Sequence, residues 1–310
     1  MSRSYEALMN RLLDATAVIH VPVKLFAILV ILRHTPKNMR TLSIFLLNHM
    51  IWNFVGNIIN SFFHLYPMFP VTCLRMDGIV NYFTDSEDFG HTIYFILFFC
   101  MVNCGVAMAL TFPYRYIVFV YPNRKFKPIP TVAFCTALHI LAPGTVVFSY
   151  LQWTVSYDDY PLKKDLPERK SLICFKPSGW ENDVTLMTFL ALVAVLIIII
   201  VGFAVLLLRS IHKQKGIMHE KLLNKHKRIL WNLIIITSVP IFFGGVPLLA
   251  VTIYMFKPQL PYATEITTIS VVVLANHGTL YALVLIAAIP PYRRAILGFL
   301  MKRATVRNAH

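Results

Sequence analysis

The sequence predicts an all-α membrane protein built as a bundle of seven transmembrane helices, and three observations support this fold class. Hydrophobic residues make up 57% of the chain and charged residues only 14%, whereas a soluble domain carries roughly 25% charge. Seven apolar segments each reach the roughly 20 residues of helix that a bilayer core requires. Lys and Arg are concentrated in alternate loops, as in other proteins that cross the membrane several times.

The seven predicted spans are separated by polar joints that contain proline, such as 34–37, 121–130 and 257–261. The spans are approximately 12–32, 41–64, 91–120, 131–153, 184–211, 229–256 and 266–289. The first apolar segment lacks a small-residue cleavage site, so we interpret it as a membrane helix and not as a signal peptide. A count of six or eight would follow if the sixth or the first segment were misread.

We expect a single seven-transmembrane domain over residues 1–303, followed by a short cytoplasmic tail at 304–310. Pro290 and Pro291 end the seventh span. Segment 292–303 has one apolar helix face, and basic residues flank this face. The apolar residues are Ala295, Ile296, Phe299 and Leu300. An amphipathic basic segment after a span is typical of a helix that lies in the membrane interface, although a frayed tail remains the alternative.

The loop charges predict that the N-terminus lies outside and the C-terminus inside. In this orientation the inner loops and the tail hold nineteen Lys and Arg residues and the outer segments nine, and Glu220 is the only acidic residue inside. The positive-inside rule therefore accounts for the net charge of +15, and no nucleic-acid partner is expected. The alternative use of the inner charge is docking of an acidic partner, which the seven basic residues of 209–228 favour.

Several polar residues lie inside the predicted spans, where they are expected to face the bundle interior. Those of the second span are three or four residues apart and share one helix face: His49, Asn53, Asn57 and Asn60. We predict a polar network that joins three helices through Lys24, Asn53, Asn276 and His277. For each Asn the alternative is simple contact between helices, worth about 0.6 kcal/mol per hydrogen bond.

The five cysteines divide into two groups. Cys73 and Cys174 fall in outer loops, which face an oxidising compartment, and are expected to pair; Cys100, Cys104 and Cys135 fall inside spans and are expected to be buried thiols. The sequence contains no HExxH, GxSxG or Walker motif and no close metal-ligand spacing. We therefore predict no enzymatic activity, no metal and no cofactor.

Five short motifs follow one another along the chain. They are His34-Thr-Pro-Lys-Asn-Met-Arg40, Ser43-Ile-Phe-Leu-Leu-Asn48, Pro113-Tyr-Arg-Tyr116, His277-Gly-Thr-Leu280 and Pro291-Tyr-Arg-Arg294. In this order the chain resembles the nematode serpentine chemoreceptor superfamily of the Str, Srh, Sri and Srd classes, and most of all Srh. The resemblance extends over about 22–297.

The resemblance implies a G-protein-coupled receptor that senses small environmental molecules, as in olfaction, in the plasma membrane or ciliary membrane of sensory neurons. Its implied partners are a small-molecule ligand, a heterotrimeric G protein and the lipid bilayer. Arg115 would take the place of the Arg in the Asp-Arg-Tyr motif of rhodopsin-like receptors, although Tyr114 here replaces the acidic neighbour. The expected coupling surface consists of Tyr114, Arg115, Tyr116, Lys225, Lys227 and Arg228.

A ligand pocket would open among spans two, three, six and seven, with aromatic walls and few polar anchors. Its candidate residues are Asn57, Asn60, Tyr94, Phe98, Phe242 and Tyr254. The alternative functions are a small-solute transporter or channel and a membrane scaffold. The pair Gly244–Gly245, with Pro240 and Pro247 beside it, interrupts the sixth span alone, which favours a hinge over a transport pathway. The ligand, the Gα class and the oligomeric state stay open.

Overall fold

The structure, a computed structural model, describes residues 3–84, 86–122, 128–166 and 172–307. In this part of the chain seven helical segments are long and apolar enough to cross a membrane, as the sequence predicted. The spans are α1 (Arg3–His34), α2 (Arg40–Phe63), α3 (Glu87–Val120), α4 (Pro128–Trp153), α5 (Trp180–Lys213), α6 (Glu220–Pro240) continued by α7 (Val246–Phe256), and α8 (Ala263–Ala288). A last helix, α9 (Pro290–Arg307), follows.

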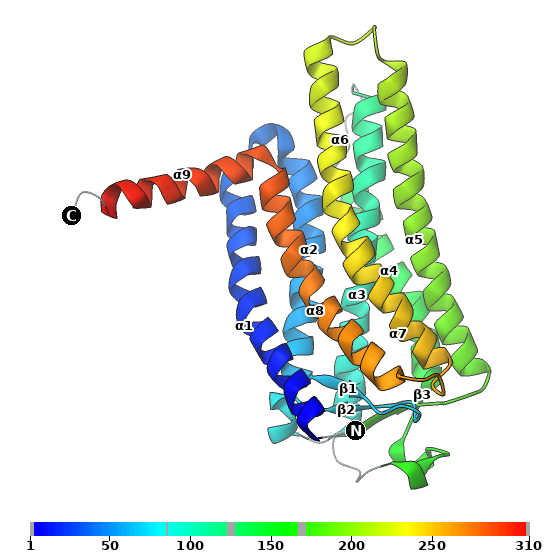
Figure 1. Cartoon of the computed structure of the whole chain (residues 1–310). Helices are drawn as coiled ribbons and strands as arrows, with labels where there is room; N and C mark the ends of the chain where they lie inside the picture. The colour runs from blue at the N-terminus through cyan, green and yellow to red at the C-terminus, as the bar shows by residue number, and fades with distance from the viewer. Residues whose placement is uncertain (1–2, 85, 123–127, 167–171, 308–310) are drawn as a thin grey trace.

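The spans run up and down in one bundle (Figure 1). Helix α3 packs against α2, α4 and α5, and α8 packs against α1, α6 and α7. A short sheet lies at the end of the bundle that carries the N-terminus, and α9 leaves from the opposite end (Figure 1). We name these the sheet end and the α9 end.

The sixth span is longer than predicted, because α6 begins at Glu220 and not near residue 229. The predicted basic loop 209–228 is therefore mostly helical, since α5 continues to Lys213. Lys, Arg and Leu all favour helix, and Leu223 and Leu230 bury an apolar face one heptad apart. Part of the predicted joint 121–130, with Arg124, Lys125 and Lys127, lies outside the described residues.

Helices α6 and α7 meet at a π-helical turn, Ile241–Gly245, where the sequence predicted a break. Pro247 lies in the first turn of α7 and has no N–H to donate, so one hydrogen bond of a regular helix cannot form. Gly244 is buried against α8: a Cβ placed on it would lie 3.5 Å from Cδ2 of His277. This is an ordinary van der Waals distance, so the π-turn packs beside that ring.

A four-stranded antiparallel sheet, which was not predicted from the sequence, covers the sheet end. Its strands are β1 (Leu65–Pro67), β2 (Cys73–Met76), β3 (Thr154–Val155) and β4 (Leu172–Phe175), in the order β1-β2-β4-β3. Cys73 lies opposite Cys174 in the β2–β4 register, and a disulfide joins the two residues. The sheet thus connects the α2–α3 loop to the α4–α5 loop.

Ion pairs fasten α1 to this sheet. Arg75 Nη2 donates to Glu6 at 2.8 Å, and Arg75 Nε donates to Asp77 at 2.5 Å. The hydrogen bonds to Asp77 raise the pKa of Arg75 further above its usual value. Nearby, burial lowers the pKa of His64 despite the Asp14 carboxylate 3.5 Å away.

At the α9 end, the last helix turns away from the bundle (Figure 1). It begins at Pro290 and Pro291, where prolines fit because the first N–H groups of a helix have no partner inside it. Tyr292 is fully buried and its hydroxyl lies 2.8 Å from Thr35 Oγ1; burial raises its pKa. The base of α9 is thereby fixed to the end of α1.

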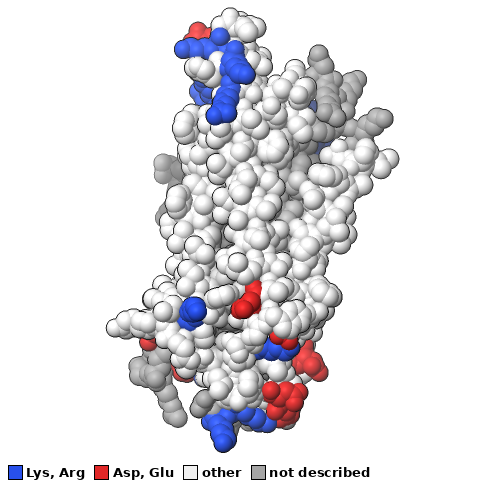
Figure 2. Space-filling view, turned by 90° about the vertical axis from the view of Figure 1, so that its right-hand side faces the viewer, with Lys and Arg blue, Asp and Glu red and all other residues white. Residues whose placement is uncertain are grey.

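The charged side chains lie at the two ends of the bundle. On the face shown in Figure 2, the α9 end carries mainly Lys and Arg, the sheet end carries both acidic and basic residues, and a broad uncharged band lies between the two ends. Such a band is the surface that a bilayer core covers.

Candidate ligand site

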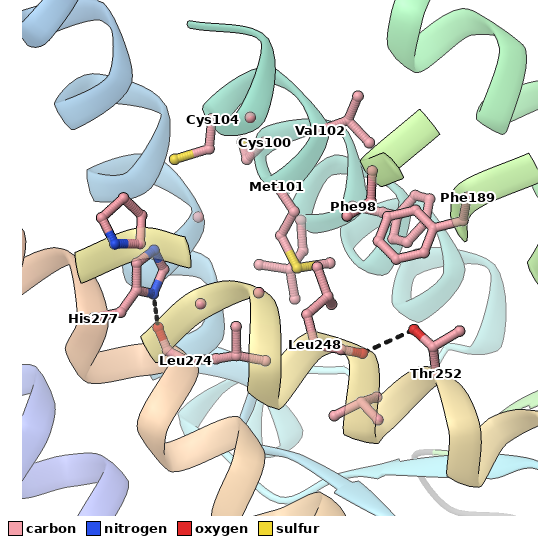
Figure 3. Close-up of a pocket in the computed structure, with 18 of the residues that line it drawn as sticks. Phe98, Cys100, Met101, Val102, Cys104, Phe189, Leu248, Thr252, Leu274 and His277 are labelled. Atoms are coloured by element: carbon pink, nitrogen blue, oxygen red, sulfur yellow. Dashed lines mark hydrogen bonds between the residues drawn. The ribbon is translucent and has the colours of Figure 1, made fainter. Parts of the chain in front are cut away.

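A cavity of about 260 Å³ lies inside the bundle, between the sheet and the π-turn, close to the lower end of the roughly 300–1,000 Å³ usual for ligand pockets. Its walls come from α2, α3, α5, α7 and α8, and among the described residues no Lys, Arg, Asp or Glu lines it. Figure 3 shows Met101 extending from α3 toward Leu248, with Phe98 and Phe189 on one side and His277 on the other. The cavity suits an uncharged molecule.

The α2 wall is polar. All four residues that the sequence placed on one helix face line the cavity: His49, Asn53, Asn57 and Asn60. Asn57 Nδ2 donates to the Ala275 carbonyl at 2.6 Å. The His49 Nδ1–H donates to the Cys104 carbonyl at 3.0 Å, because a carbonyl oxygen can only accept.

A chain of hydrogen bonds runs behind this wall from α1 to α8. Lys24 Nζ donates to Asn53 Oδ1 at 2.5 Å, and Asn53 Nδ2 lies 2.9 Å from His277 Nε2. His277 Nδ1 lies 2.5 Å from the Leu274 carbonyl. Since the lysine only donates and the carbonyl only accepts, each direction is fixed, and His277 is neutral with its proton on Nδ1.

Lys24 is fully buried, and among the described residues no carboxylate pairs with it. Among these residues, its hydrogen-bond partner is the Asn53 amide oxygen. A Cβ on Gly278 would collide with that same Asn53 carboxamide. Glycine at this position is therefore what allows α8 to approach α2 closely enough for the chain to close.

The opposite wall is aromatic, as the sequence suggested. Phe98 packs on Phe189 with ring centroids 4.9 Å apart, and Tyr94 stacks on Tyr150 at 5.9 Å. Tyr94, Phe98 and Phe189 line the cavity. These rings come from α3, α4 and α5, so this side of the pocket is built by α3–α5 and not by the sixth span.

Three sequence predictions do not fit the geometry. Phe242 is 64% exposed on the outer side of the π-turn and lines no part of the cavity, because the π-turn rotates its side chain outward. Tyr254 is also absent from the lining, since its hydroxyl donates to the Pro261 carbonyl at 3.4 Å. Asn276 does not join the Lys24 chain; it donates to Thr16 Oγ1 at 3.2 Å and ties α8 to α1.

Other lining residues were missed by the sequence analysis. Leu248 and Met101 fill the centre of the cavity, where their apolar character gave no signal beyond ordinary span composition. Thr267 also lines it, and its buried Oγ1 has no hydrogen-bond partner. This hydroxyl is free to bind a polar group of a ligand, and a lone Thr in a span gives no sequence signal for that role.

At the α9 end, the predicted coupling residues form two groups. Arg115 Nη2 lies 3.2 Å from His226 Nδ1 on α6, and the His226 ring packs on Phe119 of α3 with centroids 4.8 Å apart. Lys225, Lys227 and Arg228 are exposed on α6 around this contact. His226 was not among the predicted coupling residues; it holds α3 to α6 where no acidic neighbour of Arg115 is present in the sequence.

The remaining coupling candidates are packed inside the bundle. The Tyr114 ring lies 4.8 Å from that of Phe45 on α2, and the Tyr116 ring lies 5.6 Å from that of Phe203 on α5. Both tyrosines are half-buried. They contact neighbouring helices on either side of Arg115.

Seven spans around an uncharged central cavity form the architecture of a seven-transmembrane receptor fold. Squid rhodopsin has the same fold: its crystal structure matches with a TM-score of 0.71 at 14% identity, covering 99% of this chain and 88% of that one. The Srh family of serpentine seven-transmembrane G-protein-coupled chemoreceptors matches residues 5–302, and the chain belongs to this family. No curated protein matches it.

Membership of this family confirms the resemblance seen in the motifs. The protein is therefore a G-protein-coupled chemosensory receptor and a multi-pass protein of the plasma membrane, and the transporter alternative is not favoured.

Proposed function

We propose that the central cavity is the ligand site and that its ligand is a small uncharged molecule with a single polar group. The observation that carries this is the lining, which is apolar and aromatic except for the polar face of α2, His277 and three threonines. The hydroxyls of Thr185 and Thr252 donate to backbone carbonyls, whereas the buried hydroxyl of Thr267 has no partner among the described residues. Small-molecule sites usually combine an apolar wall with a few placed polar groups. The arrangement supports binding, and we propose no catalytic step.

We further propose that the sheet end faces outward. A disulfide joins Cys73 to Cys174 at that end, and disulfides persist in oxidising compartments and not in the cytosol. The disulfide therefore supports the orientation that the loop charges predict, by an argument that does not depend on those charges. The basic α9 would then lie along the inner leaflet, with the Arg115–His226 contact at the cytoplasmic side.

Signalling would require the two arrangements of a receptor to differ in affinity for the ligand. The π-turn borders the cavity through Ile241, Gly244 and Gly245, and α6 extends from it to His226, beside Arg115. We propose that a ligand in the cavity favours movement of α6, which separates His226 from Arg115. Arg115, the tyrosines beside it, Lys225, Lys227 and Arg228 would then meet the G protein.

The test begins with a screen of small volatile and water-soluble compounds against cells that express the chain, with a calcium readout. The first active compound is then applied to Leu97→Trp, which fills the cavity wall, and to Ile96→Trp, its exposed neighbour on α3. We expect potency to fall at least about tenfold, or about 1.4 kcal/mol of binding, in the first variant only. Equal potency in both variants at equal surface expression would contradict the site.

Coupling is tested by ligand-dependent nucleotide exchange on a co-expressed Gα. We expect exchange to be abolished by Arg115→Ala and by neutralising Lys225, Lys227 and Arg228 together. Exchange that survives both changes would show that the coupling surface lies elsewhere.

A further inference from the structure

The cavity is closed at the sheet end by two layers of protein. Leu65, Leu74 and Trp153 form its end wall and are each less than 10% exposed. A second apolar cluster covers the outer side of the strands, with Tyr160 and Leu172 both buried. The Tyr160 hydroxyl accepts a hydrogen bond from the Thr72 N–H at 2.9 Å, and the disulfide fixes β2 to β4. The sheet leaves no short route from water.

The other end of the cavity is closed as well. Met108, Ile200 and Pro240 form its floor. Below them the main hydrophobic core fills the bundle, and Phe112, Leu207 and Leu230 are each 1% exposed. A ligand cannot reach the cavity from the α9 end without separating this core.

The side wall between α5 and α7 is thin by comparison. Ile197 lines the cavity and is also 37% exposed on the outer surface, so one side chain separates the two. Across from it, Leu248 and Val251 of α7 line the cavity and are partly exposed. Gly245 also lines it, and a Cβ placed there would meet no atom within 4 Å.

This side wall lies in the apolar part of the span. Ile197 belongs to an uninterrupted aliphatic stretch of α5, residues 195–201, so its exposed face is covered by acyl chains and not by water. An uncharged ligand that partitions into the bilayer would be concentrated beside it. The route from lipid to the cavity then crosses only the Ile197 side chain and the open space beside Gly245.

We propose that the ligand is a lipophilic molecule that enters the cavity from the bilayer, between α5 and α7, with Ile197 as the gate. The proposal rests on the cavity being the ligand site, and it adds the route of entry and the membrane-partitioning class of ligand. Entry through the membrane explains how a site beneath a disulfide-bonded sheet can be filled without opening that sheet.

The experiment uses the full-length receptor in lipid vesicles and two photoreactive probes, a diazirine-bearing octanol and photo-leucine, a zwitterionic diazirine amino acid. After a short exposure a flash attaches the probe, and mass spectrometry measures labelling of Met101 inside the cavity. We expect octanol labelling of Met101 and little photo-leucine labelling. Ile197→Trp should slow octanol labelling about tenfold and Ile197→Ala should speed it, while an overnight exposure gives equal labelling.

Ile198→Trp is the matched control, because its neighbouring side chain is 68% exposed and does not line the cavity; labelling should stay at the wild-type rate. If photo-leucine labels Met101 as fast as the octanol probe, entry is from water and the proposal is wrong, although the cavity remains the ligand site. If both Ile197 variants keep the wild-type rate, the gate is elsewhere and the proposal is again overturned. If Met101 is never labelled, the proposed entry route is wrong. The independent Leu97→Trp test then decides whether the cavity is still the ligand site.

Discussion

Asn53→Leu is predicted to destabilise the receptor because Asn53 is the centre of the hydrogen-bond chain. The replacement keeps the volume similar but removes the acceptor of Lys24 and the donor to His277. A hydrogen bond to a charged group contributes about 1.5–3 kcal/mol, and one between neutral groups in a membrane about 0.6 kcal/mol. We therefore expect a loss of about 2–4 kcal/mol, most of it from leaving the buried ammonium of Lys24 without a partner.

The effects of replacing Lys24 and Asn53 on stability should be strongly coupled. Lys24→Met in the Asn53→Leu background removes the unpaired ammonium, so the double variant should be more stable than Asn53→Leu alone. Replacing both members of a buried polar pair is often nearly neutral, whereas removing one is not. The expected coupling energy is about 1–3 kcal/mol.

Thermal unfolding in detergent micelles measures both the stability loss of Asn53→Leu and the coupling energy. A thiol-reactive dye reports unfolding through Cys100 and Cys104, which are buried in the folded bundle. At roughly 2–4 °C per kcal/mol for a large domain, Asn53→Leu should lower Tm by roughly 5–15 °C. Asn60→Leu is the matched control on the same helix face, because the Asn60 side chain makes no hydrogen bond to another described residue. An unchanged Tm for Asn53→Leu, or additive effects in the double variant, would refute the reasoning.

Three further predictions address other contacts. Gly278→Ala should lower the free energy of unfolding by about 1–3 kcal/mol, because the added Cβ collides with the Asn53 carboxamide on α2. Gly202→Ala is the control and should leave the free energy of unfolding unchanged, because its Cβ meets nothing within 4 Å. The same dye assay measures both variants. His226→Ala should raise basal nucleotide exchange about two- to tenfold, since losing its contact with Arg115 removes roughly 0.5–1.5 kcal/mol from the closed arrangement; unchanged basal exchange would contradict it. Because burial lowers the folded-state pKa of His64, its stability contribution is present above pH 6.5 and is lost as the pH falls below it. His64→Gln should therefore lose less stability than wild type between pH 7 and pH 5, as Tm measured across that range will show.

The sequence predicted the span count and the polar face of α2 because both depend on local pattern. Twenty apolar residues require a helix in lipid whatever surrounds them, and residues three or four apart share a face by helix geometry alone. The disulfide pair followed from compartment chemistry. For the same reason the break near Gly244 was visible: proline and glycine act on their own backbone.

What the sequence did not predict depends on contacts between distant segments. Residues 73–75 of β2 pair with residues 172–174 of β4, although the spans α3 and α4 lie between them in the chain. Strands of two to four residues carry too little pattern to be recognised alone. The outward rotation of Phe242 depends on the extra residue of the π-turn. Thr267 and His226 have roles only because of what lies opposite them, an open cavity and an arginine from another helix.

These contacts give the receptor a physical connection between cavity and coupling surface. His277 ends the hydrogen-bond chain that holds α1, α2 and α8 together, and its ring also lies against Gly244 in the π-turn. It lines the cavity as well, so a ligand beside it contacts both the fixed helices and the part of the sixth span that is not a regular helix. Because the Nδ1 and Nε2 atoms are both engaged, the ring cannot turn to follow a ligand without breaking the chain. The ligand would then more readily displace the π-turn, where helical hydrogen bonding is already interrupted. A displacement of the π-turn would move α6, which carries His226 and its contact with Arg115.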